Sequence, residues 1–501
     1  MTEAMRQPLP PLIEAMFDTA RYPDPAARVD LVETHASWLL LAGEFVYKIK
    51  KPVLLPFLDY GSLGRRLECC EAELRLNRRF APELYLAVVA LTGTPEDPQV
   101  GGCGPVIEYA VKMRRFAEAG RLDRLCARGQ LRPNQLSELA ASIAGFHQEA
   151  AAAARSSRFG EPEQVLAPAL ANFDELTRLL SGDAERMRLL QLADWTRSEF
   201  ARLRPRFAFR KAEGRVRECH GDLHLGNLVL IGEHVTLFDC IEFSEDLRWI
   251  DVASEIAFTY IDLLDHQQPG LANWLVNEWL ACSGDYDALQ VLRFYAVYRA
   301  LVRAKVAAIR SVQIRAAHRQ AYDYLTLAEH LVAKPAARLL ITHGVSGCGK
   351  SRASKRILLG DKSATTIRLR SDIERKRLFG VGPTASSGSP VDRGIYSRNR
   401  SELTYRRLHL LTQDLLAAGW SVIVDATFLE RAWRDDFRML ATQAGVAFGI
   451  VAPRAEPAQL RSRVRSRLAR GHDASEATLA VLAQQMARVE PLCADELGCL
   501  V

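Results

Sequence analysis

Several features that would place this chain in a particular class are missing from it. Its 501 residues include ten cysteines, but there is no C-x-x-C pair and no Cys/His spacing that would hold zinc. No apolar run approaches the ~18 residues of a membrane span. The first residues carry acids and prolines instead of a basic segment with an apolar core. These absences predict a cytoplasmic protein with reduced thiols and no membrane association.

The chain also lacks a strong charge of either sign. Its 66 basic and 60 acidic residues leave a formal charge of +6, which suits an anionic ligand but is far below the basic stripe of a dedicated nucleic-acid binder. Hydrophobic residues make up 48% and charged residues 25%, the balance of a soluble globular protein. At roughly 100–200 residues per domain, the length predicts two to four folding units.

The clearest change of pattern lies at residues 333–337, between a long helical stretch and an abrupt strand. We therefore expect two domains, residues 1–334 and 335–501. The first should contain a β-hairpin at residues 36–49 and a helix at residues 62–80. Two mostly helical stretches are expected at residues 165–204 and 250–330, with a compact β-rich segment between them at residues 219–243.

The second part alternates strand and helix, which indicates a parallel α/β sheet. Its strands are expected at residues 338–343, 365–370, 421–425 and 446–451. Its helices are expected at residues 349–359, 400–418 and 430–443, with further helices to the end. The Gly/Ser/Pro segment 380–390 is predicted to be a mobile loop.

The first chemical motif is His220-Gly-Asp222-Leu-His-Leu-Gly-Asn227. An Asp and an Asn five apart in a loop have the spacing with which kinase catalytic loops supply a base and a Mg²⁺ ligand. Two short apolar segments around the turn 232–234 follow, and this hairpin should bring Asp239 beside Asn227. Carboxylate and amide oxygens together are what a Mg-nucleotide site requires.

These residues resemble the aminoglycoside phosphotransferase and choline kinase group, relatives of protein kinases that phosphorylate hydroxyls of small molecules. The resemblance implies a two-lobed, protein-kinase-like α+β domain. It further implies that Asp222 is the base for the acceptor hydroxyl and that Asn227 and Asp239 are metal ligands.

A kinase of this kind needs a strand lysine for the nucleotide phosphates and a helical glutamate to hold it. Lysine is scarce in this chain, so Lys48 and Lys50 on one face of a predicted strand stand out. We favour Lys48, and Lys50 remains an alternative. Glu73 is the preferred partner, with Glu68 and Glu71 as competitors on the same helix.

The segment Glu108–Met113, after the glycines at 101–104, resembles the connection between kinase lobes that receives adenine. Glu108 is therefore predicted to lie at the nucleotide. The glycine-rich lid over the phosphates is missing, because the matching turn at residues 33–37 has no glycine.

The second motif is a full G-x-x-x-x-G-K-[ST] match after a predicted strand and before a predicted helix, the context of a P-loop. Its backbone N–H groups and the helix N-terminus would bind the phosphates, the lysine would reach the β/γ-phosphates and the serine would hold Mg²⁺. The predicted nucleotide-binding residues are Gly344, Ser346, Gly347, Cys348, Gly349, Lys350 and Ser351.

Three further features favour a kinase over other P-loop proteins. Asp372 follows the second strand, at the sheet edge where an acceptor hydroxyl would bind. Asp425 ends a buried strand at a position that would hold Mg²⁺ or its water. Arginines crowd residues 461–470, although a solvated basic helix face would explain any single one of them. The N-K-x-D motif of GTPases is missing.

This set resembles the small P-loop kinases of the gluconate kinase, polynucleotide kinase and zeta-toxin group, with an α/β parallel-sheet fold. The resemblance implies that Asp372 is the base. It also implies that one or two of Arg463, Arg467 and Arg470 stabilise the transferring phosphoryl from a lid.

The order of the parts resembles bacterial fused proteins that join an aminoglycoside phosphotransferase-like domain to an ATP-binding domain. We expect a phosphotransferase with two nucleotide sites that transfers the γ-phosphoryl of Mg-ATP to a hydroxyl of a small molecule. An ATP-binding switch without phosphotransfer and an aminoglycoside-inactivating kinase are the alternatives. The modest charge does not favour a nucleic-acid acceptor, although Arg368, Arg370, Arg375 and Lys376 leave one open beside Asp372. Both acceptors and the oligomeric state are left undefined.

Overall fold

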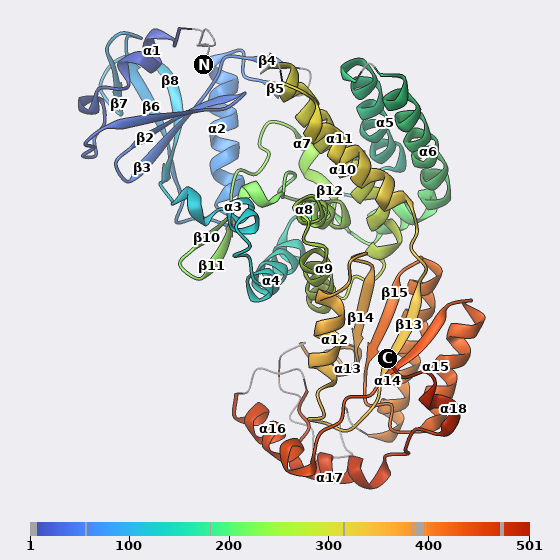
Figure 1. Ribbon diagram of the computed structural model, residues 1–501. Coiled ribbons are helices and arrows are strands. Elements are labelled where there is room, and N and C mark those ends of the chain that lie inside the picture. The colour runs from blue at the N-terminus through green and yellow to red at the C-terminus, as the bar shows by residue number, and fades with distance from the viewer. Residues whose placement is uncertain are drawn as a thin grey trace. The chain divides into compact units, whose positions relative to one another are not determined.

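The computed structural model describes residues 8–55, 58–180, 182–313, 316–382, 385, 395, 397–470 and 475–501 (Figure 1). The chain separates into two compact units. Unit 1 takes residues 1–131, 151–160 and 214–251, and unit 2 takes 132–150, 161–213 and 252–501. Most of the predicted loop at 380–390 lies outside the described residues. Over the described part of the chain, no helix combines the length and the apolar character needed to span a bilayer.

Unit 1 is built on a six-stranded antiparallel sheet in the order β1-β2-β3-β8-β6-β7. The strands are β1 (Val29–Glu33), β2 (Ser37–Ala42), β3 (Phe45–Lys50), β6 (Tyr85–Gly93), β7 (Pro98–Val100) and β8 (Val106–Arg114). The predicted hairpin is confirmed, because β2 and β3 pair from Ser37↔Lys50 to Ala42↔Phe45. Strand alternation sends Tyr47 and Ile49 into the core, where both are fully buried. Lys48 and Lys50, which alternate with them, therefore share the other face of β3.

Helix α2 (Leu63–Asn77) packs against β6 and β8 and confirms the predicted helix. The side chain of Ser62 caps it by accepting a hydrogen bond from the Arg65 amide at 3.2 Å. The rest of unit 1 contains the second hairpin, β10 (Leu228–Ile231) and β11 (His234–Leu237), in register from Leu228↔Leu237 to Ile231↔His234. Around it lie α3 (Leu122–Ala127), β9 (Val216–Glu218), η3 (Leu225–Asn227), α7 (Glu245–Arg248) and β12 (Trp249–Asp251).

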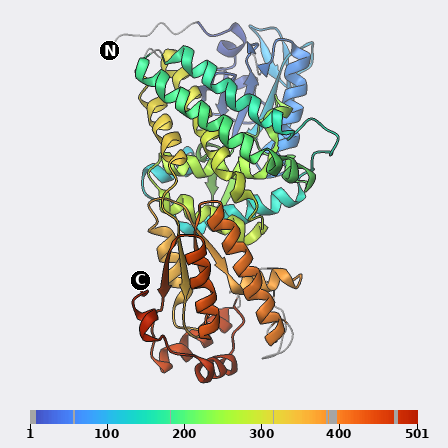
Figure 2. The same ribbon diagram turned by 90° about the vertical axis from the view of Figure 1, so that its right-hand side faces the viewer.

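Unit 2 consists of a helical part and a parallel sheet. The helices of the first part are α4 (Pro133–Glu149), α5 (Pro162–Leu179), α6 (Asp183–Ala212), α8 (Val252–Asp265), α9 (Pro269–Ser283), α10 (Ala288–Gln313) and α11 (Arg319–Val332). Helices α5 and α6 pack side by side, as Figure 2 shows. Helix α8 is buried over nearly its whole length, and its polar residues Ser254, Glu255, Thr259 and Asp262 are buried with the apolar ones.

The parallel sheet has the order β14-β15-β13-β16, as the alternation of strand and helix predicts. Its strands are β13 (Arg338–Thr342), β14 (Thr366–Arg370), β15 (Ser421–Asp425) and β16 (Ala447–Val451). The helices are α12 (Lys350–Leu359), α13 (Ser371–Leu378), α14 (Arg398–Ala417), α15 (Arg431–Gln443), α16 (Pro457–Arg470), α17 (Leu479–Arg488) and α18 (Ala494–Leu497). Helix α12 contacts β14 and β15, whereas α15 contacts β13 and β16.

The helical part of unit 2 covers the free edge of this sheet. Asn277 of α9 donates through Nδ2 to the carbonyl of Thr366 at 2.9 Å and accepts at Oδ1 from the amide of Arg368 at 2.6 Å. One amide side chain thus takes the place of a neighbouring strand at edge strand β14. Capping an edge in this way satisfies backbone groups that would otherwise be open to pairing with another chain.

Candidate active sites

The two strand lysines of unit 1 converge on Glu73 of α2. Lys48 Nζ lies 2.8 Å from Glu73 Oε1 and 2.6 Å from Asp239 Oδ1. Lys50 Nζ lies 2.7 Å from Glu73 Oε2 and also contacts Glu242. The predicted partners Lys48 and Glu73 therefore do meet. Lys48 also reaches Asp239, whereas Lys50 is fully buried behind it.

Opposing effects set the protonation of this group. Burial alone would lower the pKa of Lys48, but the carboxylates of Asp239 and Glu73 outweigh it and raise that pKa well above the usual value. Burial would raise the pKa of Glu73, yet Lys48 and Lys50 bring it below its usual value. Burial would also lower the pKa of Lys50, but Glu242 and Glu73 raise that pKa well above its usual value. Both lysines and Glu73 are therefore charged at neutral pH.

The loop 220–227 holds Asp222 and Asn227 against each other. The side-chain amide of Asn227 donates to Asp222 O at 3.0 Å and to Asp222 Oδ2 at 3.1 Å. His220 orients the loop, because its Nδ1 accepts from the Asp222 amide at 3.3 Å and its Nε2 lies 2.8 Å from the carbonyl of Phe238. These partners fit the neutral ring with the proton on Nε2.

The second hairpin brings Asp239 to this loop, as the sequence predicts. The amide of Phe238 donates to the carbonyl of Asn227 at 3.0 Å, so Asp239 follows at the same end of the hairpin. Asp239 has φ 63°, in the left-handed region, and its amide donates to Tyr85 Oη at 2.9 Å. The amide of Cys240 is held by Asn77 Oδ1 at 2.9 Å. Tyr85 and Asn77 were not identified from the sequence.

The donor set of this site fits Mg²⁺. The side-chain nitrogen of Asn227 is engaged by Asp222, which leaves the amide oxygen as the atom for a cation. The side chain of Asp239 is 46% exposed, so it can bind a metal while one of its oxygens contacts Lys48. An amide and a carboxylate oxygen are hard ligands of the kind that Mg²⁺ takes together with phosphate.

The expected lobe connection at Glu108–Met113 is wrong in its placement, because this segment is part of strand β8 and pairs with β3 and β6. Glu108 is buried and its carboxylate accepts from Arg66 Nε at 2.9 and 3.0 Å. An alternating run such as Glu-Tyr-Ala-Val-Lys-Met is typical of a strand. That Glu108 takes part in nucleotide binding stays a prediction, and its partner here is an arginine.

The P-loop sequence of unit 2 forms a tight turn between β13 and α12. Gly344 has φ 130°, and a Cβ there would lie 2.9 Å from Cys348 Sγ. Gly349, at φ 110°, precedes the first residue of α12, so backbone N–H groups gather at a helix N-terminus. Lys350 Nζ donates to the carbonyls of Gly344 and Val345 at 2.8 and 2.9 Å.

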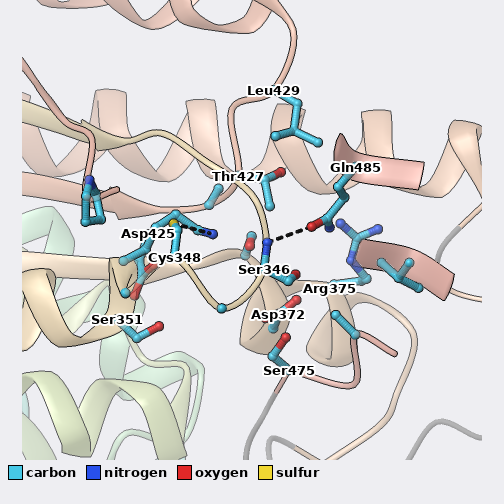
Figure 3. Close-up of a pocket in the computed structure, with 18 of the residues that line it drawn as sticks. Ser346, Cys348, Ser351, Asp372, Arg375, Asp425, Thr427, Leu429, Ser475 and Gln485 are labelled. Atoms are coloured by element: carbon cyan, nitrogen blue, oxygen red, sulfur yellow. Dashed lines mark hydrogen bonds between the residues drawn. The ribbon is translucent and has the colours of Figure 1, made fainter. Parts of the chain in front are cut away.

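A cavity of about 1220 Å³ opens at this loop (Figure 3). Of the predicted nucleotide residues, Ser346, Gly347, Cys348, Gly349, Lys350 and Ser351 line it, and Gly344 does not. The predicted acids Asp372 and Asp425 and the arginines Arg463 and Arg467 also line it. The structure therefore brings the two acids, the loop and both arginines to one space.

Asp425 and the two arginines in this cavity have definite partners. Asp425 Oδ2 accepts from Ser354 Oγ of α12 at 2.9 Å. Arg463 Nη1 donates to the carbonyl of Gly347 at 3.2 Å, and Arg467 Nη2 donates to the carbonyl of Ala477 at 3.0 Å. A serine hydroxyl and a buried carboxylate at a P-loop suit Mg²⁺ beside phosphates. The side chain of Arg470, the third predicted lid arginine, lies outside the described residues.

Several lining residues escaped the sequence analysis. Gln485 of α17 accepts from the amide of Ser346 at 2.7 Å, as Figure 3 shows. Tyr405 of α14 and Trp433 of α15 stack with ring centroids 4.7 Å apart. Of the four basic residues predicted beside Asp372, Arg375 is the one that lines the described cavity. The positions of Gln485, Tyr405 and Trp433 depend on how helices pack, which no local sequence motif encodes.

Comparison with known families identifies both parts of the chain. Residues 61–295 match the model described as the phosphotransferase enzyme family, and residues 339–492 match the model described as an AAA domain. The chain therefore joins a protein-kinase-like phosphotransferase domain to an α/β P-loop domain, and the two resemblances expected from the motifs are confirmed. Domains of these types support kinase-type phosphotransfer.

The chain belongs to the same family as uncharacterized proteins of Mycobacterium tuberculosis and Mycobacterium bovis. Each is 30% identical over 467 residues, which cover 92% of this chain and 90% of the relative. Among solved structures, a choline/ethanolamine kinase family protein from Mesorhizobium loti matches with 14% identity and a TM-score of 0.40, covering 63% of this chain and 90% of the other. A choline kinase from Cryptosporidium parvum matches with 10% identity and a TM-score of 0.39, covering 64% and 92%.

Proposed function

We propose that this protein is an ATP-dependent phosphotransferase with two nucleotide sites, each transferring the γ-phosphoryl of Mg-ATP to a hydroxyl of a small molecule. The observation that carries the proposal is the contact of Lys48 with both Glu73 and Asp239, beside the linked pair Asp222 and Asn227. A lysine held by a glutamate, a second carboxylate and an Asp–Asn pair are the side chains that kinases use for phosphoryl transfer. The P-loop cavity of unit 2 supports a second such site.

In unit 1 the position of each residue determines its role in the transfer. Lys48, held by Glu73, binds the nucleotide phosphates. Asn227 and Asp239 would hold Mg²⁺, whose charge would offset that of the phosphates. Asp222 orients the acceptor hydroxyl and takes its proton while the hydroxyl oxygen bonds to the γ-phosphorus and ADP leaves. The Asn227 amide fixes the Asp222 carboxylate for this task.

In unit 2 the P-loop amides and Lys350 bind the phosphates, and Ser351 and Asp425 would hold Mg²⁺. Asp372 is the base. Arg463 and Arg467 stabilise the charge of the transferring phosphoryl. Phosphate contacts would draw the Lys350 ammonium away from the two loop carbonyls that it now contacts.

The test is product formation. Purified protein with γ-labelled ATP, Mg²⁺ and a bacterial metabolite extract is analysed by mass spectrometry for labelled phosphate esters. Asp222→Asn should abolish one set of products and Lys350→Ala another, each by at least about 100-fold. The matched controls Asp30→Asn on β1 and Lys362→Ala, an exposed lysine outside the P-loop cavity, should leave both sets unchanged.

The alternatives predict different results. An ATP-driven switch would bind nucleotide at both sites and yield no labelled ester. An aminoglycoside-inactivating kinase would label an added aminoglycoside in a reaction that requires Asp222. The first result would overturn the present proposal, whereas the second would identify an aminoglycoside as the acceptor of the first site.

A further inference from the structure

A second cavity of unit 2, about 630 Å³ in volume, lies at the edge of the parallel sheet away from the P-loop. Thr365 and Trp420, which immediately precede strands β14 and β15, both line it. The acids Asp372 and Asp425 lie at the other ends of the same two strands and line the P-loop cavity. The strands therefore separate the two cavities, and neither of the proposed active sites uses the second one.

The size and the walls of this cavity suit a small organic molecule. Sites for such molecules typically measure about 300–1,000 Å³ and are lined mainly by apolar and aromatic side chains with a few polar groups. Helices α8, α10 and α11 supply most of the wall here. Its apolar part includes Leu264, Leu292, Leu327, Leu331 and the rings of Tyr260 and Trp420. These side chains can cover the hydrocarbon body of a ligand.

The polar group that indicates the chemistry of the ligand is Arg293 of α10. Its side chain lines the cavity, although the residue is only 8% exposed. Nη2 donates to the carbonyl of Gly419 at 3.4 Å, whereas Nη1 has no hydrogen-bond partner within the described part of the chain. The guanidinium also packs over the ring of Trp420, 5.6 Å from its centroid. Arg293 is thus a buried cation with an unused donor at the wall of a cavity.

No neighbouring carboxylate fully compensates this cation. Burial lowers the pKa of Arg293 below its usual value, and the charge of Glu199 does not offset that effect. The Glu199 carboxylate is itself engaged, because it accepts from Arg202 at 2.6 and 2.9 Å. An arginine nevertheless stays charged at neutral pH. A ligand oxygen with a negative charge would satisfy both the free donor and the buried charge.

The other charges of the wall limit what this ligand can be. The Asp, Glu, Lys and Arg residues among its described lining are Asp265, Asp323, Lys362 and Arg293, and Asp323 and Lys362 are exposed. Two acids and two bases leave no positive surplus for a phosphate monoester, which carries about −1.5 to −2 at pH 7. A carboxylate carries a single charge, and its oxygens match the donors of one guanidinium.

We propose that this cavity is a binding site for a small organic carboxylate. The carboxylate accepts a hydrogen bond from Nη1 of Arg293, and the hydrocarbon body packs against Trp420 and the leucines of α8, α10 and α11. The proposal concerns binding alone and does not depend on phosphotransfer at the other two sites.

The first test measures the binding of three probes, benzoate, 3-phenylpropionate and octanoate, by ligand-observed NMR. The full chain is used with excess Mg²⁺ and a non-hydrolysable ATP analogue, so that the probes do not occupy the nucleotide sites. At least one carboxylate should bind. Its uncharged amide should bind at least about 10-fold more weakly, because it lacks the charge-assisted hydrogen bond to Arg293. Phenyl phosphate should also bind more weakly than the carboxylate.

The second test changes the wall. Arg293→Met should weaken binding of the same probe at least about 10-fold. Leu327→Trp fills the space of the hydrocarbon body from a half-buried position and should exclude the probe, whether or not the Arg293 variant folds. The matched control is Arg310→Met, at an exposed arginine of α10 outside the described lining, and it should bind the probe like the parent chain.

Four results would overturn the proposal. The first is the absence of binding for all three carboxylates, and the second is a folded Arg293→Met chain that binds like the parent. The third is an amide that binds as tightly as its carboxylate, because the cavity would then not select an anion. The fourth is tighter binding of phenyl phosphate, which would assign the site to a phosphate ester.

Discussion

Replacing Lys50 by Met should destabilise unit 1 more than replacing Lys48, although the two residues are neighbours on one strand face. Lys50 is fully buried and contacts the carboxylates of Glu73 and Glu242, the latter side chain 5% exposed. Without Lys50, the Glu242 carboxylate keeps a contact with the Tyr60 hydroxyl but loses the ammonium beside it. Removing one partner of a buried ion pair leaves the other charge uncompensated, and this typically lowers the free energy of unfolding by about 3–5 kcal/mol.

The same reasoning gives a smaller cost for Lys48→Met. Glu73 keeps Lys50 as a partner, and Asp239 is 46% exposed, so water can replace the lost ammonium there. We expect a loss of about 1.5–3 kcal/mol in the free energy of unfolding, the range of a hydrogen bond to a charged group. For catalysis the order of the two variants should be reversed, with Lys48→Met the more damaging. Lys48→Met should abolish transfer at the first site, whereas Lys50→Met should leave measurable transfer with a raised KM for ATP.

The assay must read local stability, since a chain with two compact units need not unfold in one step. Hydrogen exchange of the peptides covering β3 and α2 reports the free energy of opening in that region. Kinetics in a Lys350→Ala background report the first site alone. The double variant Lys50→Met/Glu242→Gln should recover part of the stability, because it removes the unpaired carboxylate. Equal protection in the two lysine variants, or stronger loss in Lys48→Met, would refute the argument.

Three further outcomes follow from single side chains. Asp222→Asn should lower transfer at the first site by at least about 100-fold while ATP binding, measured by calorimetry, is unchanged, and a parallel loss of both would assign Asp222 to folding instead. Burial lowers the pKa of His343, so the unfolded chain takes up its proton first and stability falls as the pH drops below about 6.5. His343→Gln should flatten that acid limb in thermal unfolding, and an unaltered limb would contradict this. Asn277→Leu removes both side-chain hydrogen bonds to β14 and should lower the free energy of opening of the β14 amides, measured by hydrogen exchange, by about 1–3 kcal/mol. Exchange rates equal to those of the parent chain would contradict this prediction.

What the sequence predicts well in this protein is local. The P-loop and the hairpins at residues 37–50 and 228–237 follow from turn residues and periodicity within short segments. The meeting of Asp239 with Asn227 also follows, because a hairpin of equal arms returns the chain to its start. Which glutamate of α2 contacts Lys48 depends on the helix face that packs against the sheet. That face carries Glu73, the residue that the sequence analysis favours.

What the sequence does not predict depends on distant partners. Lys50 and Glu242 lie 192 positions apart, and neither shows from its local pattern that it is buried against the other. The resemblance of Glu108–Met113 to a lobe connection predicts a link, yet pairing with β3 and β6 makes this segment part of strand β8. Tyr405 and Trp433 form their stacked pair through the packing of two helices, for which no sequence motif exists.

At the boundary predicted between residues 334 and 335, the chain passes from helices to the parallel sheet. Residues on the two sides of this boundary nevertheless pack against each other within unit 2. Helix α13, which carries Asp372, also carries Glu374, and the buried Glu374 carboxylate accepts from the Tyr286 hydroxyl at 3.0 Å. Arg377 of the same helix donates to the carbonyl of Ala281 at 2.7 Å. Tyr286 and Ala281 precede the boundary, and so does Asn277 at the edge of β14. The position of the acid proposed as base in the P-loop site is therefore set partly by helices that the sequence assigns to the other domain.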